Sequence, residues 1–150
     1  MKSDNDIKGR LKSALSYCYK ILNYKPYTEF EIAQKIGKKF GDDVVDQTLE
    51  KLKKARLVDD RLYVKLWVNS RINSHPEGII VMKYKLKQKG IPNSIVEEYF
   101  SLNEIDEKEM IRSVIEKKLK HYNGDKNKMY KYLLGRGFNS ENISLILKDF

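Results

Sequence analysis

An internal repeat constrains the fold of this chain more than any other feature of its sequence. The segment "KLKQKGIPNSIVEEYF" (85–100) aligns with "YLLGRGFNSENISLIL" (132–147), so that Gly90 falls on Gly137. A third segment, "KIGKKFGDDVVDQTLE" (35–50), matches more loosely and lacks the glycine at that position. Copies separated by roughly 50 residues are typical of tandem arrays, in which one supersecondary unit packs on the next. The repeat therefore predicts an elongated protein with a long continuous surface.

The units of this array are predicted to be helical. Apolar residues recur at three- and four-residue spacing, as in Ile111, Val114 and Ile115, and alternating runs of β-branched residues are missing. This is the period of an α-helix with one buried face. We expect nine short helices, near 8–23, 28–38, 42–56, 60–73, 78–89, 93–102, 107–122, 126–135 and 140–149.

Several of the expected helix ends carry their own signals. The spacing within 28–31 and 94–97 predicts capping boxes, in which a Thr or Ser and a Glu bond to each other's backbone. Gly90 and Gly137 are expected to end the preceding helices in the left-handed conformation. The acidic residues predicted to cap helix N-termini are Asp59, Asp106 and Asp125.

The charge balance favours a polyanionic partner. The 150 residues include 30 lysines and arginines against 21 acidic residues, which gives a net charge of +9. A basic excess of this size is typical of proteins that bind nucleic acid or an acidic protein surface, although lysine-rich proteins without such a partner also exist.

The sequence favours a soluble cytoplasmic protein. Cys18 is the single cysteine, so no disulfide can form within the chain. The first ten residues are polar, which predicts no signal peptide. No apolar run approaches the roughly 20 residues needed to span a bilayer, so we expect no membrane contact.

Catalysis is poorly supported by the sequence. His75 and His121 are the only histidines, and neither has metal-ligand spacing to the other or to Cys18. A phosphate-binding GxxxxGK[ST] loop is absent, and "LGRGF" (134–138) follows a helix rather than a strand. We expect structural roles for these residues, with Cys18 as a small buried apolar side chain, and we predict no catalytic residue, metal or cofactor.

Binding is better supported, beginning with "DDRLYVKLWVNSR" (59–71). We expect Trp67 to be a core anchor rather than a base-stacking residue, and the two aspartates at 59 and 60 to cap the helix. Arg61 and Arg71 lie at its two ends, where a guanidinium can form a fork with phosphate or carboxylate.

The segment "KYKLKQKGI" (83–91) carries four lysines but not a single basic stripe. Because a helix has 3.6 residues per turn, Lys83 and Lys87 share one face while Lys85 and Lys89 share another. The residues expected to face the core between these rows are Ile79, Met82 and Leu86. Solvation alone explains such a helix, and a binding row along the outer surface explains it too.

Taken together, four segments are distinctive: "YKPYTEFEIAQKI" (24–36), "LEKLKKARLVDDRLYVKLWVNSR" (49–71), "EGIIVMKYKLKQKGI" (77–91) and "LLGRGFNSENI" (133–143). In this order they resemble the RecX family, the bacterial regulators of the RecA recombinase. The second segment is the most specific, with a leucine-spaced helix, paired aspartates and an aromatic helix that ends in Arg71.

The chain departs from the family pattern at a few positions. Lys25 and Tyr27 replace the arginines usual around Pro26, and Leu62 stands where the family usually has phenylalanine. Gly78 is not followed by the proline that is common there.

The resemblance implies an all-α protein of three tandem three-helix units, elongated and curved, with bounds of 1–57, 58–104 and 105–150. It implies a monomer that binds in the groove of the RecA–single-stranded DNA filament, limits filament extension, promotes disassembly, and lowers ATP hydrolysis and strand exchange. Such a protein acts in DNA repair, recombination and the SOS response without being an enzyme. The expected binding residues are Arg61, Arg71, Lys83, Lys87, Lys89 and Arg136, while those expected to hold the units together are Trp67, Leu86, Ile91 and Phe138.

Two other functions stay open from the residues alone. Three-helix units of this size also occur in helix-turn-helix modules, which would bind single- or double-stranded nucleic acid directly and with sequence preference. A helical-repeat adaptor for an acidic protein would need no nucleic acid at all.

Overall fold

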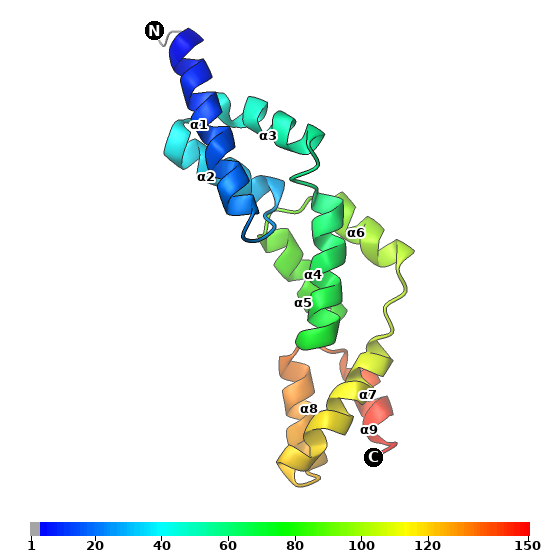
Figure 1. Cartoon of the computed structure of the whole chain (residues 1–150). Helices are drawn as coiled ribbons and strands as arrows, with labels where there is room; N and C mark the ends of the chain where they lie inside the picture. The colour runs from blue at the N-terminus through cyan, green and yellow to red at the C-terminus, as the bar shows by residue number, and fades with distance from the viewer. Residues whose placement is uncertain (1–3) are drawn as a thin grey trace.

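The protein is built entirely from helices over residues 4–150, the part of the chain that the computed structural model describes (Figure 1). Residues 1–3, which the first predicted unit includes, lie outside the described residues. The predicted all-α class is confirmed. The elements are α1 Asp4–Leu22, α2 Glu29–Phe40, the 3-10 turn η1 Asp42–Val44, α3 Val45–Lys54, α4 Asp60–Ser74, α5 Ile79–Gln88, α6 Asn93–Leu102, α7 Glu107–Lys118, the 3-10 turn η2 Leu119–Tyr122, α8 Lys126–Gly135 and α9 Ser140–Leu147.

The helices form three bundles arranged in a row, namely α1–α3, α4–α6 and α7–α9 (Figure 1). The most extensive helix contacts lie within the bundles, as between α7 and α9 or between α4 and α6. A compact protein of 17.7 kDa exposes about 8,000 Å², whereas this chain exposes 9874 Å². The extra surface is that of a row of small units, and the predicted elongated, curved array of three-helix units is confirmed.

Two hydrophobic cores run through the array. The first lies within α1–α3 and includes Ile32, Leu52 and the buried Cys18, while the second is continuous through the other two units. Leu86, Ile91 and Phe138 are buried in the second core, as predicted. Trp67 is only half-buried and packs against the edge of this core.

Most of the predicted helix ends are confirmed. Thr28 and Glu31 form a complete capping box, and Gly90 and Gly137 both take positive φ angles of 83° after α5 and α8. The aspartates that accept a backbone amide at the start of α4, α7 and α8 are Asp59, Asp106 and Asp125.

Other predicted ends are wrong. The second capping box does not form, because α6 begins at Asn93 with Pro92 at its N-cap, which has no side-chain acceptor. The first repeat does have a stop glycine, since Gly41, one residue beyond the aligned position, ends α2 with a φ of 101°. The helix α1 begins at Asp4 rather than near residue 8.

The helices predicted at 42–56 and 107–122 are each divided. The first begins as the tighter turn η1, directly after Gly41 with its positive φ, before α3 starts. The second ends as η2, before Asn123 and Gly124 reverse the chain with positive φ angles. Short 3-10 turns of this kind are common where an α-helix begins or ends.

The first joint in the array places the N-terminus of α2 against the C-terminus of α5. The Thr28 hydroxyl donates a hydrogen bond of 2.7 Å to the Lys89 carbonyl, and the Glu29 amide donates one of 3.0 Å to Asp60 Oδ1. Asp60, predicted to cap its own helix, therefore satisfies a free amide in the preceding unit instead.

The second joint repeats this plan between α5 and α8. The Gly78 amide donates to the Arg136 carbonyl at 2.9 Å, and the Ile79 amide donates to Glu107 Oε1 at 3.4 Å. In both joints the first residue of the next unit's first helix, Asp60 or Glu107, accepts an amide from the start of the previous unit's second helix. The three second helices are thereby linked end to end.

Candidate functional site

The lysines of α5 divide into two rows, as predicted from their spacing. Lys83 and Lys87 both bind Glu97 of α6, with Nζ to carboxylate distances of 2.9 Å and 3.3 Å. Lys85 points the other way and binds Glu77 at 2.7 Å. The hydrogen bonds from Lys83 and Lys87 lower the pKa of Glu97 below its ordinary value. The first row therefore keeps one net positive charge after pairing.

Two of the predicted binding residues, Arg61 and Lys89, are paired with neither Glu97 nor Glu77. Arg61, at the start of α4, forms an ion pair with Glu98 of α6, and both side chains are well exposed. Lys89 contributes its carbonyl to the first joint, and its ammonium group has no ion pair among residues 4–150. The structure thus brings together only some of the six predicted cations.

A buried carboxylate gathers the remaining predicted cations at the second joint. We call Glu77, Arg71, Lys85 and Arg136 the Glu77 cluster. Glu77 is only 1% exposed, and its Oε2 lies 2.7 Å from Lys85 Nζ and 3.9 Å from Arg136 Nη2. Its Oε1 lies 4.0 Å from Arg71 Nη1 and has no hydrogen bond among the described residues. A buried carboxylate needs such compensation, and three cations surround this one.

The two arginines of the Glu77 cluster are held in place by further contacts. Arg71 lies over the Trp67 ring with its guanidinium carbon 4.8 Å from the ring centroid. Arg136 donates from Nε to the Pro76 carbonyl at 3.2 Å and from Nη2 to the His75 carbonyl at 3.0 Å. Because Arg136 belongs to the third unit and the others to the second, the cluster also fastens the second joint.

Sequence reasoning missed half of this cluster. Lys85 was predicted to share its row with Lys89, and Glu77 was assigned no role. An acidic residue in a turn between helices is ordinarily exposed, so the burial of Glu77 has no signal in its own segment. The pairing of Glu77 with Arg136 joins residues from different repeats, which helical periodicity within one segment does not predict.

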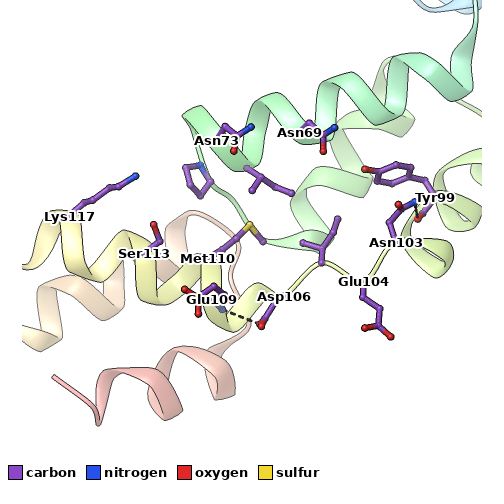
Figure 2. A pocket seen from close by; sticks show the side chains of 13 residues that line it. Asn69, Asn73, Tyr99, Asn103, Glu104, Asp106, Glu109, Met110, Ser113 and Lys117 are labelled. Carbon is purple, nitrogen blue, oxygen red and sulfur yellow. Dashed lines mark hydrogen bonds between the residues drawn. The ribbon is translucent and has the colours of Figure 1, made fainter.

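A groove of about 560 Å³ lies between the second and third units (Figure 2). Figure 2 shows Asn69 and Asn73 projecting from α4 on one side, with Glu109 and Ser113 on α7 across from them. Some of its polar groups are used locally, since Asp106 accepts the Glu109 amide as a helix cap. Within the described part of the chain, no group of three or more His, Cys, Asp and Glu residues could hold a metal ion.

The residues considered for catalysis are dispersed. His75 ends α4 and is exposed, and His121 lies exposed in η2. Cys18 is fully buried in the first core, and this burial raises the pKa of its thiol to about 11. The predicted burial of Cys18 is confirmed. Across residues 4–150, none of the helices has both the length and the apolar character that crossing a membrane requires.

Comparisons with known proteins agree with this architecture. Models for the first, second and third three-helix domains of RecX match residues 14–52, 59–99 and 106–147. A "Regulatory protein RecX" from Prosthecochloris aestuarii is 30% identical, with 98% of this chain and 97% of that protein covered. Another, from Chlorobaculum tepidum, is 32% identical, with 94% and 90% covered. The crystal structure of RecX from Lactobacillus salivarius superposes with a TM-score of 0.77 at 26% identity, covering 98% and 97%.

Proposed function

The chain belongs to the RecX family of regulatory proteins, and from this premise we propose that it regulates the RecA recombinase, mainly as a negative modulator. It binds as a monomer in the groove of the RecA–single-stranded DNA filament, limits filament extension and promotes disassembly. It thereby lowers ATP hydrolysis and strand exchange during DNA repair and recombination in the cytoplasm, without catalytic activity of its own. The observation that carries the proposal is the ordered match of all three RecX domains along this chain.

The physical properties of the chain support this proposal. A row of three units linked by two hydrogen-bonded joints offers several contact patches on one body. Such patches add their binding through effective concentration, so each contact can be weak. The net charge of +9 favours approach to a filament that contains DNA phosphates, and it makes binding sensitive to salt.

We propose that the binding surface includes the six predicted cations, namely Arg61, Arg71, Lys83, Lys87, Lys89 and Arg136. Because several of these cations form ion pairs within the protein, the choice of substitution matters. Replacing Lys83 and Lys87 by glutamate would place three carboxylates together at Glu97, which destabilises the α5–α6 contact as well as any partner contact. Neutral Lys83→Gln and Lys87→Gln substitutions avoid this repulsion.

The direct test is a titration of the protein into the DNA-dependent ATPase reaction of the cognate RecA. We expect the ATPase rate to fall and then level off as the filament is saturated. An unchanged rate at stoichiometric excess would contradict the proposed function.

Variants then test the surface. The Lys83→Gln, Lys87→Gln double variant should inhibit less at equal concentration, whereas a Lys12→Gln, Lys20→Gln double variant on α1 removes the same charge elsewhere and should inhibit as the parent does. A stand-alone helix-turn-helix module would instead bind bare DNA more tightly than the assembled filament, and a comparison of the two affinities separates these functions.

A further inference from the structure

We propose that Arg71, Lys85 and Arg136 form a binding site for a phosphodiester group of nucleic acid, and that the buried Glu77 organises this site. The site lies at the second joint, between the second and third units, and it deepens the proposed function because it names the ligand of one part of the binding surface. Its test uses DNA without RecA, so that the two proposals can fail separately.

The charge of the Glu77 cluster is unbalanced. One carboxylate faces three cations, which leaves a net charge of +2 in a small region. Glu77 is buried, whereas the side chains of Arg71, Lys85 and Arg136 keep 34%, 40% and 31% of their surface exposed. The carboxylate therefore lies behind the cations, where it reduces their mutual repulsion, and the cations remain accessible to an anion from solvent.

Arg71 has hydrogen-bonding capacity that the protein does not use. Its contacts are the Trp67 ring and the long ion pair with Glu77, and it donates no hydrogen bond among the described residues. A guanidinium has five N–H donors in a rigid fork suited to phosphate oxygens. Because the Trp67 ring already fixes the fork, less side-chain freedom is lost when an anion binds.

Arg136 is fixed in a different way. Two of its N–H groups are used by the His75 and Pro76 carbonyls, which determine where the guanidinium lies, and its remaining donors are available. The cations come from three separate elements, α4, α5 and the turn after α8. Donors on separate elements suit a tetrahedral phosphate, whose oxygens point in several directions, better than a flat carboxylate that accepts a single fork. The overall charge of +9 also favours a polyanion.

The experiment measures binding of the full chain to a short fluorescein-labelled oligothymidylate by fluorescence anisotropy over a series of NaCl concentrations. Arg71→Gln and Lys85→Gln each remove one phosphate contact, so each should weaken binding about tenfold. Each should also reduce the slope of log affinity against log salt, by at most about 0.7, which is the contribution of one phosphate. Lys65→Gln on α4 and Lys131→Gln on α8 remove the same charge from exposed positions of neighbouring helices, and both should leave the slope unchanged.

A purely structural role for the cluster makes a different prediction. Thermal unfolding of each variant is followed by circular dichroism, and Arg71→Lys keeps the charge near Glu77 while losing the fork. If the variants melt at lower temperature but bind the oligonucleotide with the parent's affinity and salt slope, the phosphate site is refuted. An intermediate affinity for Arg71→Lys with parental melting supports it.

The ATPase assay distinguishes the remaining outcomes. Variants that bind the oligonucleotide normally but no longer inhibit RecA would show that the cluster contacts a protein carboxylate, which overturns the phosphate assignment while the proposed function stands. Conversely, if the parent fails to inhibit RecA but its oligonucleotide binding depends on Arg71 and Lys85, the site stands and the proposed function fails.

Discussion

Replacing Gly78 with alanine should open the second joint, because no space exists there for a side chain. A Cβ atom at Gly78 would lie 1.8 Å from the Gly137 carbonyl oxygen and 2.3 Å from its carbonyl carbon. Both atoms are backbone and cannot rotate away. The Gly78 backbone, with φ −63° and ψ 152°, is one that alanine adopts readily, so the expected effect is purely steric.

These distances determine the expected loss in the free energy of unfolding. Cβ atoms essentially never approach other atoms more closely than 3.0 Å, so the two units must separate locally by about 1 Å. The hydrogen bond of 2.9 Å from the Gly78 amide to the Arg136 carbonyl is then stretched beyond a useful length. Losing it costs about 1 kcal/mol, and the remaining strain costs about 1–3 kcal/mol. We expect a total loss of about 2–4 kcal/mol in the free energy of unfolding.

Urea unfolding followed by far-UV circular dichroism measures this loss. Gly135→Ala is the matched control, because it adds the same methyl group near the end of α8, where no atom beyond the adjoining helix backbone lies within 4 Å. Alanine is the better helix former, so the control should be neutral or more stable by up to about 1 kcal/mol. A Gly78→Ala variant with the urea midpoint of the parent would refute the close contact on which this reasoning rests.

Three other outcomes are expected. Phe138→Ala should lower the free energy of unfolding by about 3–5 kcal/mol in urea titrations, because the buried ring leaves a cavity. At pH 8 the Cys18 thiol, whose pKa is about 11, should react with a disulfide reagent about a hundredfold more slowly in the folded chain than in urea. Burial raises the pKa of Asp60, so this carboxyl favours folding at low pH and its contribution is lost as the pH rises through its folded-state pKa. Asp60→Asn, which keeps an acceptor for the Glu29 amide, should therefore gain stability relative to the parent as the pH rises above about 4, and carboxyl NMR titration of Asp60 checks the same shift.

The sequence predicted the parts of this fold that depend on neighbouring residues. These parts are local signals, because each involves a hydrogen bond or a buried face within a few residues. They are the helical period, the capping aspartates at helix N-termini, and the helix stops at Gly90 and Gly137. The failed capping box at Ser94 shows the limit of such signals. Its partner Glu97 is held instead by Lys83 and Lys87 of the preceding helix, which its own segment does not reveal.

The contacts between units were not predictable in the same way. Asp60 was expected to cap its own helix, but it accepts an amide from Glu29, which lies far away in the sequence. The same holds for Glu107 and Ile79. A comparison of the repeats does contain a trace of this arrangement, since acidic residues are paired at 59–60 and again at 106–107. In each pair the first residue caps its own helix and the second serves the previous unit.

The C-termini of the three second helices, α2, α5 and α8, do not all receive their hydrogen-bond donor from the same place. Each second helix leaves backbone carbonyls at its C-terminus that need a donor. The Lys89 and Arg136 carbonyls receive theirs from the preceding unit, through Thr28 and Gly78. In the first unit the corresponding Phe40 carbonyl of α2 instead accepts a hydrogen bond of 2.7 Å from Arg10 of α1, within the same unit.

The N-termini of the second helices also contribute to the joints. The Glu29 amide of α2 and the Ile79 amide of α5 donate to Asp60 and Glu107 of the following unit. The caps themselves lie within single units, since Asp125 accepts the Lys128 amide of α8 just as Thr28 accepts the Glu31 amide of α2. The joints therefore use backbone groups and the carboxylates of Asp60 and Glu107, and under the proposed function the exposed basic side chains along the row contact the filament.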